Sequence, residues 1–524
     1  MKKIFLLVLL LTFVLTCDEA REENSKINDF PFLESDINFI QKGYKESLFS
    51  IEEVIRAYLD RIKKIDDNGP EIAAIITINP EAVKIARELD KELRDGKYRG
   101  PLHGIPIVLK DNIDTHDQME TTAGSRALIG SKALQDSYVA KKLREAGAVI
   151  LGKANLSEWA NFRGQNSTSG WSGVNGQTKN PYVLSRNPCG SSSGSAVAVS
   201  ANLSVLAIGT ETNGSIVCPA SANGIVGIKP TVGLISRSGI IPISFTQDTA
   251  GPMARSVEDA VICLGVLVGI DQSDSKTLNS KNPLISDYTP YLNKDGLKGK
   301  KIALYTAPMG KNRDVDSLTF KAIRLMKLKG AEVIEIDQIS PVETSKNSFQ
   351  VMLYEYKDGL NKYFSSLGKD SPIKNLSELI EFNEKDSIEL RYFNQAYLKM
   401  ANEKEGLESK SYKEALSSLK RMSQKEGIDR VMDEYGLDAI ISPTGSPAWK
   451  TDLINGDSYH IGSSSNAAWS GYPNITVPMG DIHGLPVGLS FFGKAWTEPK
   501  LIEIAYSFEQ ESKSRIIPEF KTTD

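Results

Sequence analysis

The stretch that decides the fold is residues 188–231, PCGSSSGSAVAVSANLSVLAIGTETNGSIVCPASANGIVGIKPT. Two clusters of Gly and Ser, residues 190–195 and 213–215, flank an apolar run, and the stretch carries almost no charge. Glycine lets a backbone approach a ligand closely, and serine can attack a carbonyl carbon when a base removes its proton. A flexible Gly/Ser linker would not contain the apolar residues 196–201 and 205–208, and no GxxxxGK[ST] phosphate loop is present. The pattern predicts two hydroxyl-bearing turns, joined by a short helix and a strand, that converge on one site.

A lysine is the candidate base for these hydroxyls. The chain has four histidines, and none lies in a GxSxG elbow. Residues 104–112, GIPIVLKDN, place Lys110 at the end of an apolar, strand-like run. Burial there would disfavour the charged ammonium and lower the pKa of Lys110, as a lysine base requires. Asp111 would oppose this shift if its carboxylate pointed the same way. The alternative is an ordinary strand-end lysine that extends its amine into water.

The chain resembles the amidase signature family. Three phrases carry the resemblance: GIPIVLKDNID at 104–114, CGSSSGSA at 189–196 and GTETNGSIVCPA at 209–220. The similarity extends from roughly residue 45 to residue 512, and the phrases within 155–182 and 211–255 are most similar to bacterial peptide amidases. The resemblance implies an α/β fold in which a mixed central β-sheet is surrounded by α-helices.

The resemblance also implies a Ser-Ser-Lys triad. Ser215 would be the nucleophile, Ser191 would relay the proton after a cis peptide bond from Gly190, and Lys110 would be the neutral base. Ser192 corresponds to a family serine that forms a supporting hydrogen bond within the triad. The implied oxyanion hole consists of the main-chain N–H groups of Thr212, Asn213, Gly214 and Ser215.

One of these positions departs from the family pattern. Many members have Gly or Asp at the position of Asn213. Because the oxyanion hole uses the main-chain N–H of this residue, the catalytic step should be unaffected. The side chain of Asn213 could change the substrate preference from that of the family.

The expected reaction is hydrolysis of a carboxamide to a carboxylate and ammonia through a serine acyl-enzyme. The C-terminal amide of a peptide is the expected substrate. The alternatives are the glutamine-hydrolysing subunit of a tRNA-dependent amidotransferase, an amidase for another small or fatty amide, and a binding protein that has lost catalysis. Retention of Lys110, Ser191 and Ser215 argues against the last.

Composition limits the partners. A net charge of −4 without a basic stripe gives no sign of nucleic-acid binding, and no Cys/His spacing indicates a metal site. No cofactor and no metal are therefore expected. The family resemblance implies a small-molecule or peptide amide as the ligand, and we expect a monomer.

The N-terminus has the composition of a targeting segment. Lys2 and Lys3 precede an apolar run, Ile4 to Thr16, that is too short to span a bilayer and is typical of a signal peptide. Cys17 follows at once, and Val-Leu-Thr-Cys resembles a bacterial lipobox, although Thr is unusual before the Cys. The prediction is an exported protein that is anchored by lipid at Cys17 in a bacterial cell envelope. An ordinary secretory signal and an uncleaved anchor are the alternatives.

Domain boundaries follow from these assignments. Residues 1–16 would be a lipoprotein-type signal peptide, residues 17–34 a polar tether and residues 35–524 a single amidase domain. Residues 340–435 are charged, predicted to be helical and without a chemical motif, which favours an insertion that flanks the substrate pocket.

Three cysteines remain in the expected domain: Cys189, Cys218 and Cys263. Cys189 and Cys218 each lie close to a candidate serine, so a disulfide between them is open. The simpler interpretation is that these cysteines are unpaired and buried, and that they pack as small apolar side chains.

Overall fold

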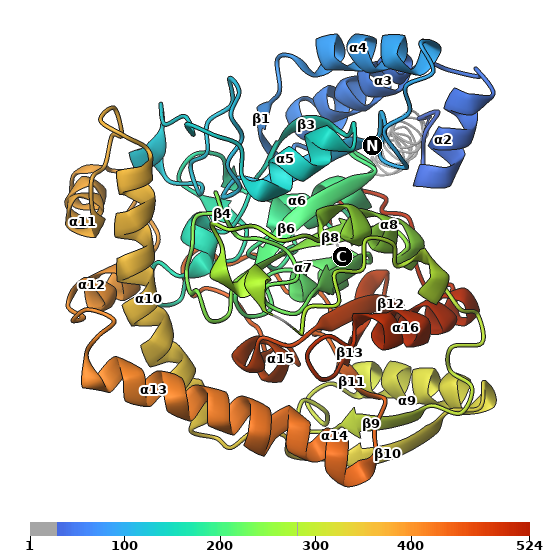
Figure 1. The fold of residues 1–524 in the computed structure, drawn as a ribbon, viewed down its shortest axis with the longest axis vertical. Helices are drawn as coiled ribbons and strands as arrows, with labels where there is room; N and C mark the ends of the chain where they lie inside the picture. Colours follow the sequence, from blue (N-terminus) through green and yellow to red (C-terminus); the bar gives the residue numbers. More distant parts are fainter. Residues whose placement is uncertain (1–28, 280, 524) are drawn as a thin grey trace, which may run out of the picture.

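The computed structural model describes residues 29–279 and 281–523, and its centre is one mixed β-sheet (Figure 1). The sheet has 11 strands in the order β1-β3-β2-β6-β8-β7-β12-β13-β11-β9-β10. Its strands are β1 (Ile75–Ile78), β2 (Pro106–Lys110), β3 (Val149–Ala154), β6 (Leu206–Glu211), β7 (Val226–Lys229), β8 (Thr249–Ala254), β9 (Lys301–Tyr305), β10 (Glu332–Ile336), β11 (Ala439–Pro443), β12 (Asn474–Ile482) and β13 (Leu485–Phe492). A separate pair consists of β4 (Trp171–Ser172) and β5 (Gly176–Gln177).

Helices surround this sheet, as the family resemblance implied. They are α2 (Ile37–Lys45), α3 (Ile51–Ile62), α4 (Ala82–Arg94), α5 (Tyr138–Glu145), α6 (Ser193–Ser200), α7 (Val217–Ala222), α8 (Val257–Leu267), α9 (Arg313–Leu328), α10 (Thr344–Ser366), α11 (Leu376–Lys385), α12 (Ala396–Asn402), α13 (Lys410–Lys420), α14 (Asp429–Tyr435), α15 (Ser465–Ser470) and α16 (Glu498–Ser512). Within the described part of the chain, no helix is both long and apolar enough to cross a bilayer.

Strand register brings the Lys110 segment to the candidate serines. β2 and β6 are neighbours and run parallel, with Leu109 paired to Ile208. Their carboxyl ends therefore lie at the same edge of the sheet, which is where open α/β sheets bind ligands. Both strands are fully buried, which explains why their sequences are continuous apolar runs instead of alternating ones.

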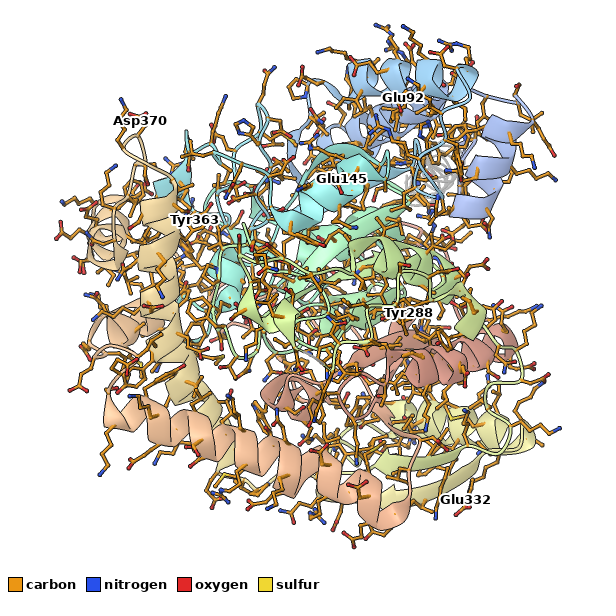
Figure 2. The ribbon with its side chains drawn as sticks, in the orientation of Figure 1. Glu92, Glu145, Tyr288, Glu332, Tyr363 and Asp370 are labelled. Atoms are coloured by element: carbon orange, nitrogen blue, oxygen red, sulfur yellow. A yellow bond between two sulfur atoms is a disulfide. The ribbon has the colours of Figure 1, made fainter. Side chains whose placement is uncertain are left out.

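Helices α10 to α14 lie together along one side of the molecule, in orange shades in Figure 1. α10 attaches to the sheet layer through buried polar contacts. The hydroxyl of Tyr363, labelled in Figure 2, donates to Asp114 Oδ1 at 2.9 Å. The buried carboxylate of Glu355 accepts from Ser244 Oγ, from Thr246 N and Oγ1, and from Tyr412 Oη. These contacts fix α10 against the segment that follows β2, the loop that follows β7 and helix α13.

The folded part of the chain begins before residue 35. Phe30 and Phe32 are buried against Tyr58, and Glu34 forms an ion pair with Arg515 at 2.7 Å. Residues 30–34 are therefore packed, whereas the sequence assigned them to the polar tether. The rest of that tether, the signal peptide and Cys17 lie outside the described residues.

Candidate active site

The side chain of Lys110 is fully buried at the end of β2, and its amine has three oxygen neighbours. Lys110 Nζ lies 2.8 Å from Ser191 Oγ, 2.9 Å from Thr210 Oγ1 and 3.2 Å from the Thr210 carbonyl oxygen. Burial lowers the pKa of Lys110 to about 7, and the nearby carboxylates of Asp248 and Glu211 act in the opposite direction. A large fraction of this lysine is therefore uncharged at neutral pH.

Asp111 does not oppose this shift. Its carboxylate accepts from the main chain of Thr122 at 3.1 Å and lies 3.9 Å from the buried amine of Lys153. The side chain thus points away from Lys110 and toward a second buried lysine.

Ser191 lies in a turn that begins with a cis peptide bond from Gly190. Ser192 holds the following end of this turn against β6, since its hydroxyl donates to the Thr210 carbonyl and accepts from the Thr210 N–H, both at 3.1 Å. The Ser192 N–H donates to the Ser215 carbonyl at 3.1 Å. Ser192 therefore supports the turn through the main chain of β6 and makes no direct bond to Lys110.

Ser215 lies in the second turn, between β6 and α7. Glu211 shapes this turn, because its Oε2 accepts from Ile216 N at 2.8 Å and Val217 N at 3.1 Å. Gly214 has a φ of 84°, a conformation in which most side chains are strained. Among the described residues, no hydrogen bond reaches the Ser215 hydroxyl, and the N–H groups of Asn213, Gly214 and Ser215 donate none.

The side chains of this second turn are also held in place. Thr212 Oγ1 donates to Asp248 Oδ1 at 2.6 Å. The Asn213 side chain accepts from Ser464 Oγ at 2.7 Å and donates to Ser465 Oγ at 3.3 Å. Asn213 is therefore fixed toward the segment before α15, which forms part of the cleft wall.

Both serines open onto one cleft of about 510 Å³. Its apolar lining comes from Ala160, Phe162, Ile243, Met352 and Trp449. Its charged lining and two of its other titratable groups come from Lys311, Asp457, Tyr459 and His460. Asp457 accepts from Ser169 N and Oγ, Asn187 Nδ2 and Trp449 Nε1, and Lys311 Nζ donates to the His460 carbonyl at 2.9 Å. These partners of Asp457 and Lys311 are uncharged groups, which hold the two side chains in place without neutralising their charges.

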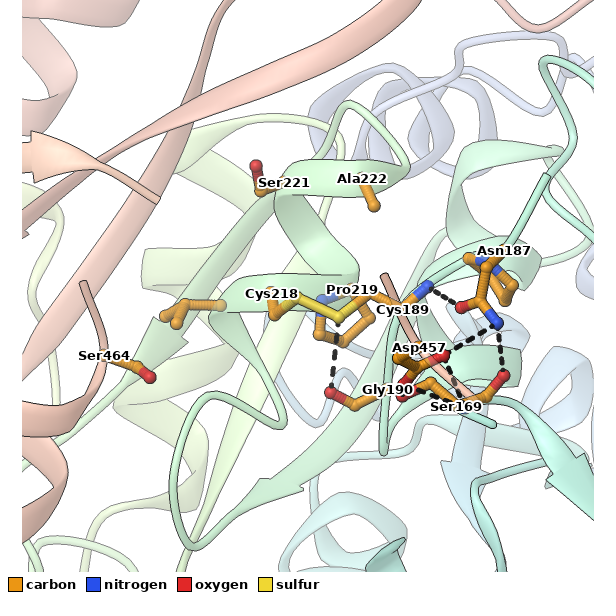
Figure 3. Close-up of a disulfide and its surroundings, with 12 residues drawn as sticks. Ser169, Asn187, Cys189, Gly190, Cys218, Pro219, Ser221, Ala222, Asp457 and Ser464 are labelled. Atoms are coloured by element: carbon orange, nitrogen blue, oxygen red, sulfur yellow. Dashed lines mark hydrogen bonds between the residues drawn. A yellow bond between two sulfur atoms is a disulfide. The ribbon is translucent and has the colours of Figure 1, made fainter. Parts of the chain in front are cut away.

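A disulfide joins Cys189 to Cys218 beside the two serines (Figure 3). The interpretation of these residues as two unpaired buried thiols is therefore wrong. Cys263 is buried and free. The sequence could not decide between these states because it does not give the distance between the two turns, and the Cα atoms of the pair are 6.0 Å apart, within disulfide range.

Sequence reasoning missed three residues around Lys110. Thr210 contacts the amine directly, Asn112 Nδ2 donates to Thr210 Oγ1 at 3.0 Å, and Asp248 contributes negative charge. All three stand in phrases that carried the family resemblance. The available signal was position: Thr210 lies one residue before the end of β6, the strand that pairs with β2.

Comparison with known proteins identifies the family. Residues 53–502 match the family described as Amidase. A probable amidase from Arabidopsis thaliana is 41% identical over 502 residues, which cover 94% of this chain and 92% of the relative. A glutamyl-tRNA(Gln) amidotransferase subunit from Clostridium botulinum is 34% identical over 486 residues, covering 88% and 93%. The crystal structure of native peptide amidase from Stenotrophomonas maltophilia has a TM-score of 0.90 at 48% identity, covering 94% and 99%.

These relatives overturn the predicted location. They include a plant amidase and one component of an amidotransferase that is named for its tRNA, and neither is described as an exported lipoprotein. The prediction of a lipid-anchored protein in a bacterial cell envelope is therefore wrong. Its error lay in reading a location from residues 1–17 alone.

Proposed function

The chain belongs to the amidase signature family, and we propose that it hydrolyses the C-terminal carboxamide of peptides through a Ser215 acyl-enzyme. Amide hydrolysis itself follows from the family. The observation that carries the proposed mechanism is the 2.8 Å contact between the buried Lys110 amine and Ser191 Oγ, beside a cleft that also receives Ser215.

Lys110 is the final acceptor of the proton that leaves Ser215. In its neutral form the amine has two N–H groups and one lone pair. The N–H groups can donate to the two oxygens of Thr210, which leaves the lone pair for the proton of Ser191. Ser191 in turn takes the proton of Ser215 as the Ser215 oxygen attacks the carboxamide carbon. This relay needs an uncharged lysine, which its burial favours.

The N–H groups of residues 212–215 would stabilise the negative oxygen that forms in this step. Loss of one such donor typically costs about 2.7–4 kcal/mol of barrier. Collapse of the intermediate breaks the C–N bond, and the proton held by Lys110 and Ser191 moves to the leaving nitrogen, which departs as ammonia. Water then attacks the acyl-enzyme by the same relay and releases the carboxylate.

The cleft supports a peptide amide over free glutamine. Glutamine carries an ammonium and a carboxylate next to each other, and burying either without a partner costs several kcal/mol. Phe162, Met352 and Trp449 offer apolar surface to a neutral chain end. The 48% identity to a peptide amidase, against 34% to the amidotransferase component, supports the same choice.

The nucleophile is tested by Ser215→Ala. This variant should lose turnover and labelling by a serine-directed fluorophosphonate, with an unchanged near-UV circular dichroism spectrum. Acylation of the Ala variant would transfer the nucleophilic role to Ser191.

The substrate is tested by ammonia release from a dipeptide amide, glutamine and a long-chain fatty amide at equal concentrations. The dipeptide amide should have the highest kcat/KM, and the matching free dipeptide should bind weakly as a competitor. A preference for glutamine that increases with tRNA and partner subunits would replace the peptide-amide assignment with an amidotransferase one. The fatty amide as best substrate would point to a lipid amidase.

A further inference from the structure

We propose that the Cys189–Cys218 disulfide is a positioning element for catalysis, so that its reduction lowers turnover. This inference rests on the proposed function, because it concerns the two turns that carry Ser191 and Ser215. The bridge leaves the chain one residue before the Gly190–Ser191 bond and re-enters it three residues after Ser215.

The two ends of the Ser191 turn are held by different means. The following end is pinned by Ser192, whose hydroxyl and N–H are bonded to Thr210 and Ser215. The preceding end is Cys189, whose N–H donates to Asn187 Oδ1 at 2.7 Å and whose side chain is covalently joined to α7 (Figure 3). On this side Ser193 Oγ also donates to the Cys189 carbonyl at 2.6 Å and Ser157 N donates to the Ser191 carbonyl at 3.0 Å. The disulfide adds a covalent restraint to these hydrogen bonds, and it is the one that links this side to α7.

The same bridge restrains the Ser215 turn. Cys218 lies in the first turn of α7, and its N–H donates to the Gly214 carbonyl at 2.8 Å, within the oxyanion segment. Between them, the Ser192–Ser215 hydrogen bond and the disulfide fix the two turns at two separate points. A second point of attachment stops the turns from pivoting about the first, and an error of about 1 Å in such a geometry can cost about 100-fold in rate.

Access to the bridge is through the substrate cleft. Both cysteines line the cleft with little exposed surface, and Trp449 and Ala222 pack against them. A dithiol reductant would supply two electrons and two protons, give two cysteine thiols and itself become a disulfide. The freed thiols can then move apart within the cleft wall. A bound substrate or competitive inhibitor covers this route and should slow the reduction.

The central experiment uses the oxidised wild-type protein with a dipeptide amide. After dithiothreitol treatment, with bridge opening confirmed by counting free thiols, kcat should fall about tenfold or more while KM changes less than about threefold. Removal of the reductant and reoxidation should restore kcat. A reduced protein that keeps its rate with the bridge demonstrably open would overturn the proposal.

Variants separate positioning from general loss of stability. Cys189→Ala/Cys218→Ala should have the low kcat of the reduced protein and should not respond to dithiothreitol. The acid limb of its pH–rate profile should also move, because the hydrogen bond between Ser191 Oγ and Lys110 Nζ is no longer well aligned. Cys263→Ala, a matched change at a free buried cysteine, should behave as wild type. Ile336→Ala in β10 serves as a destabilised control and should keep its kcat well below its Tm. If that control loses kcat to the same degree, the role of the bridge is only structural.

The design also distinguishes two kinds of failure. Oxidised wild type without activity on any amide would refute the proposed function. Active oxidised wild type that is indifferent to the bridge would refute this inference alone.

Discussion

At the scale of single residues, the pKa of Lys110 sets the expected pH dependence. Burial lowers that pKa to about 7, and the proposed base is the neutral form. The rate on a dipeptide amide should therefore rise as pH increases through about 7 and level off above it. Lys110→Ala should lose several orders of magnitude in kcat, as loss of a triad member does elsewhere. A flat profile from pH 5 to 9, or a variant that keeps a tenth of the rate, would exclude Lys110 as the base.

Asp248 offers a finer test of the same electrostatics. Its carboxylate raises the pKa of Lys110, and burial raises its own pKa only to about 6, so it is charged where Lys110 titrates. Asp248→Asn should move the acid limb to lower pH by a fraction of a unit. Asn can still accept from the N–H groups of Ile243 and Ser244 and donate to Thr212 Oγ1 after an amide flip. Glu498→Gln is a control, because it neutralises another buried carboxylate that accepts from Thr231 N, and it should leave the limb in place.

Some features of single residues could be predicted from the sequence, and others could not. The Gly/Ser clusters and the apolar run before Lys110 were readable because they combine reactive groups with burial. Thr210 and Asp248 were not, since each acts through proximity that only strand pairing and a loop contact create. The roles of Lys110, Ser191 and Ser215 remain predictions until the variants above are measured.

At the scale of elements, Glu355 joins α10 to the loop at residues 243–248. It accepts from four groups, and removing the carboxylate would leave those buried donors without a partner. Glu355→Ala should destabilise the fold by roughly 3 kcal/mol or more, since unsatisfied buried polar groups cost about 1–3 kcal/mol each. Glu355→Gln, which keeps an acceptor, should cost less. Hydrogen exchange should show the largest increase in α10 and α13, and uniform exchange across the sheet would contradict this assignment.

Local patterns predicted the elements well where their own residues decide them. The capping box Ser50–Glu53 is present at the start of α3, with both of its hydrogen bonds. β9, α9 and β10 follow one another along the chain, with β9 and β10 parallel in register. The order of all 11 strands could not be read, because it depends on long-range pairing such as β6 with β8 and β12 with β7.

At the scale of the whole molecule, buried lysines make stability depend on pH. Folding lowers the pKa of Lys110 to about 7 and that of Lys229 to about 8, from 10.5. Between these values and 10.5 each of these lysines binds more protons in the unfolded chain than in the folded one, so its contribution to the free energy of unfolding rises with pH. The raised pKa of the Cys263 thiol acts in the opposite direction above about pH 8. The buried carboxyls of Asp259 and Glu509, with pKa values raised to about 7, still hold part of their protons at pH 7.5 and reduce this slope there.

Thermal unfolding from pH 7.5 to 9 should therefore show a rising Tm. Each lysine contributes at most about 1.4 kcal/mol per pH unit. Lys110→Met should keep only part of the slope, because Lys229 still titrates, and Lys110→Met/Lys229→Met should remove most of it. A slope that is the same in the wild type and in the double variant would show that both lysines are charged in the folded protein.

Trp449 packs against the Cys189–Cys218 bridge at the wall of the cleft, and its Nε1 donates to Asp457 at 3.1 Å. A disulfide in contact with an excited indole accepts an electron from it and quenches its light. The emission of this one tryptophan, among the five in the chain, should therefore brighten when the bridge opens and respond when a ligand enters the cleft. The Trp449 signal is obtained by subtracting the emission spectrum of Trp449→Phe from that of the wild type. The wall of the cleft therefore contains an intrinsic fluorescent reporter, and no added dye is needed.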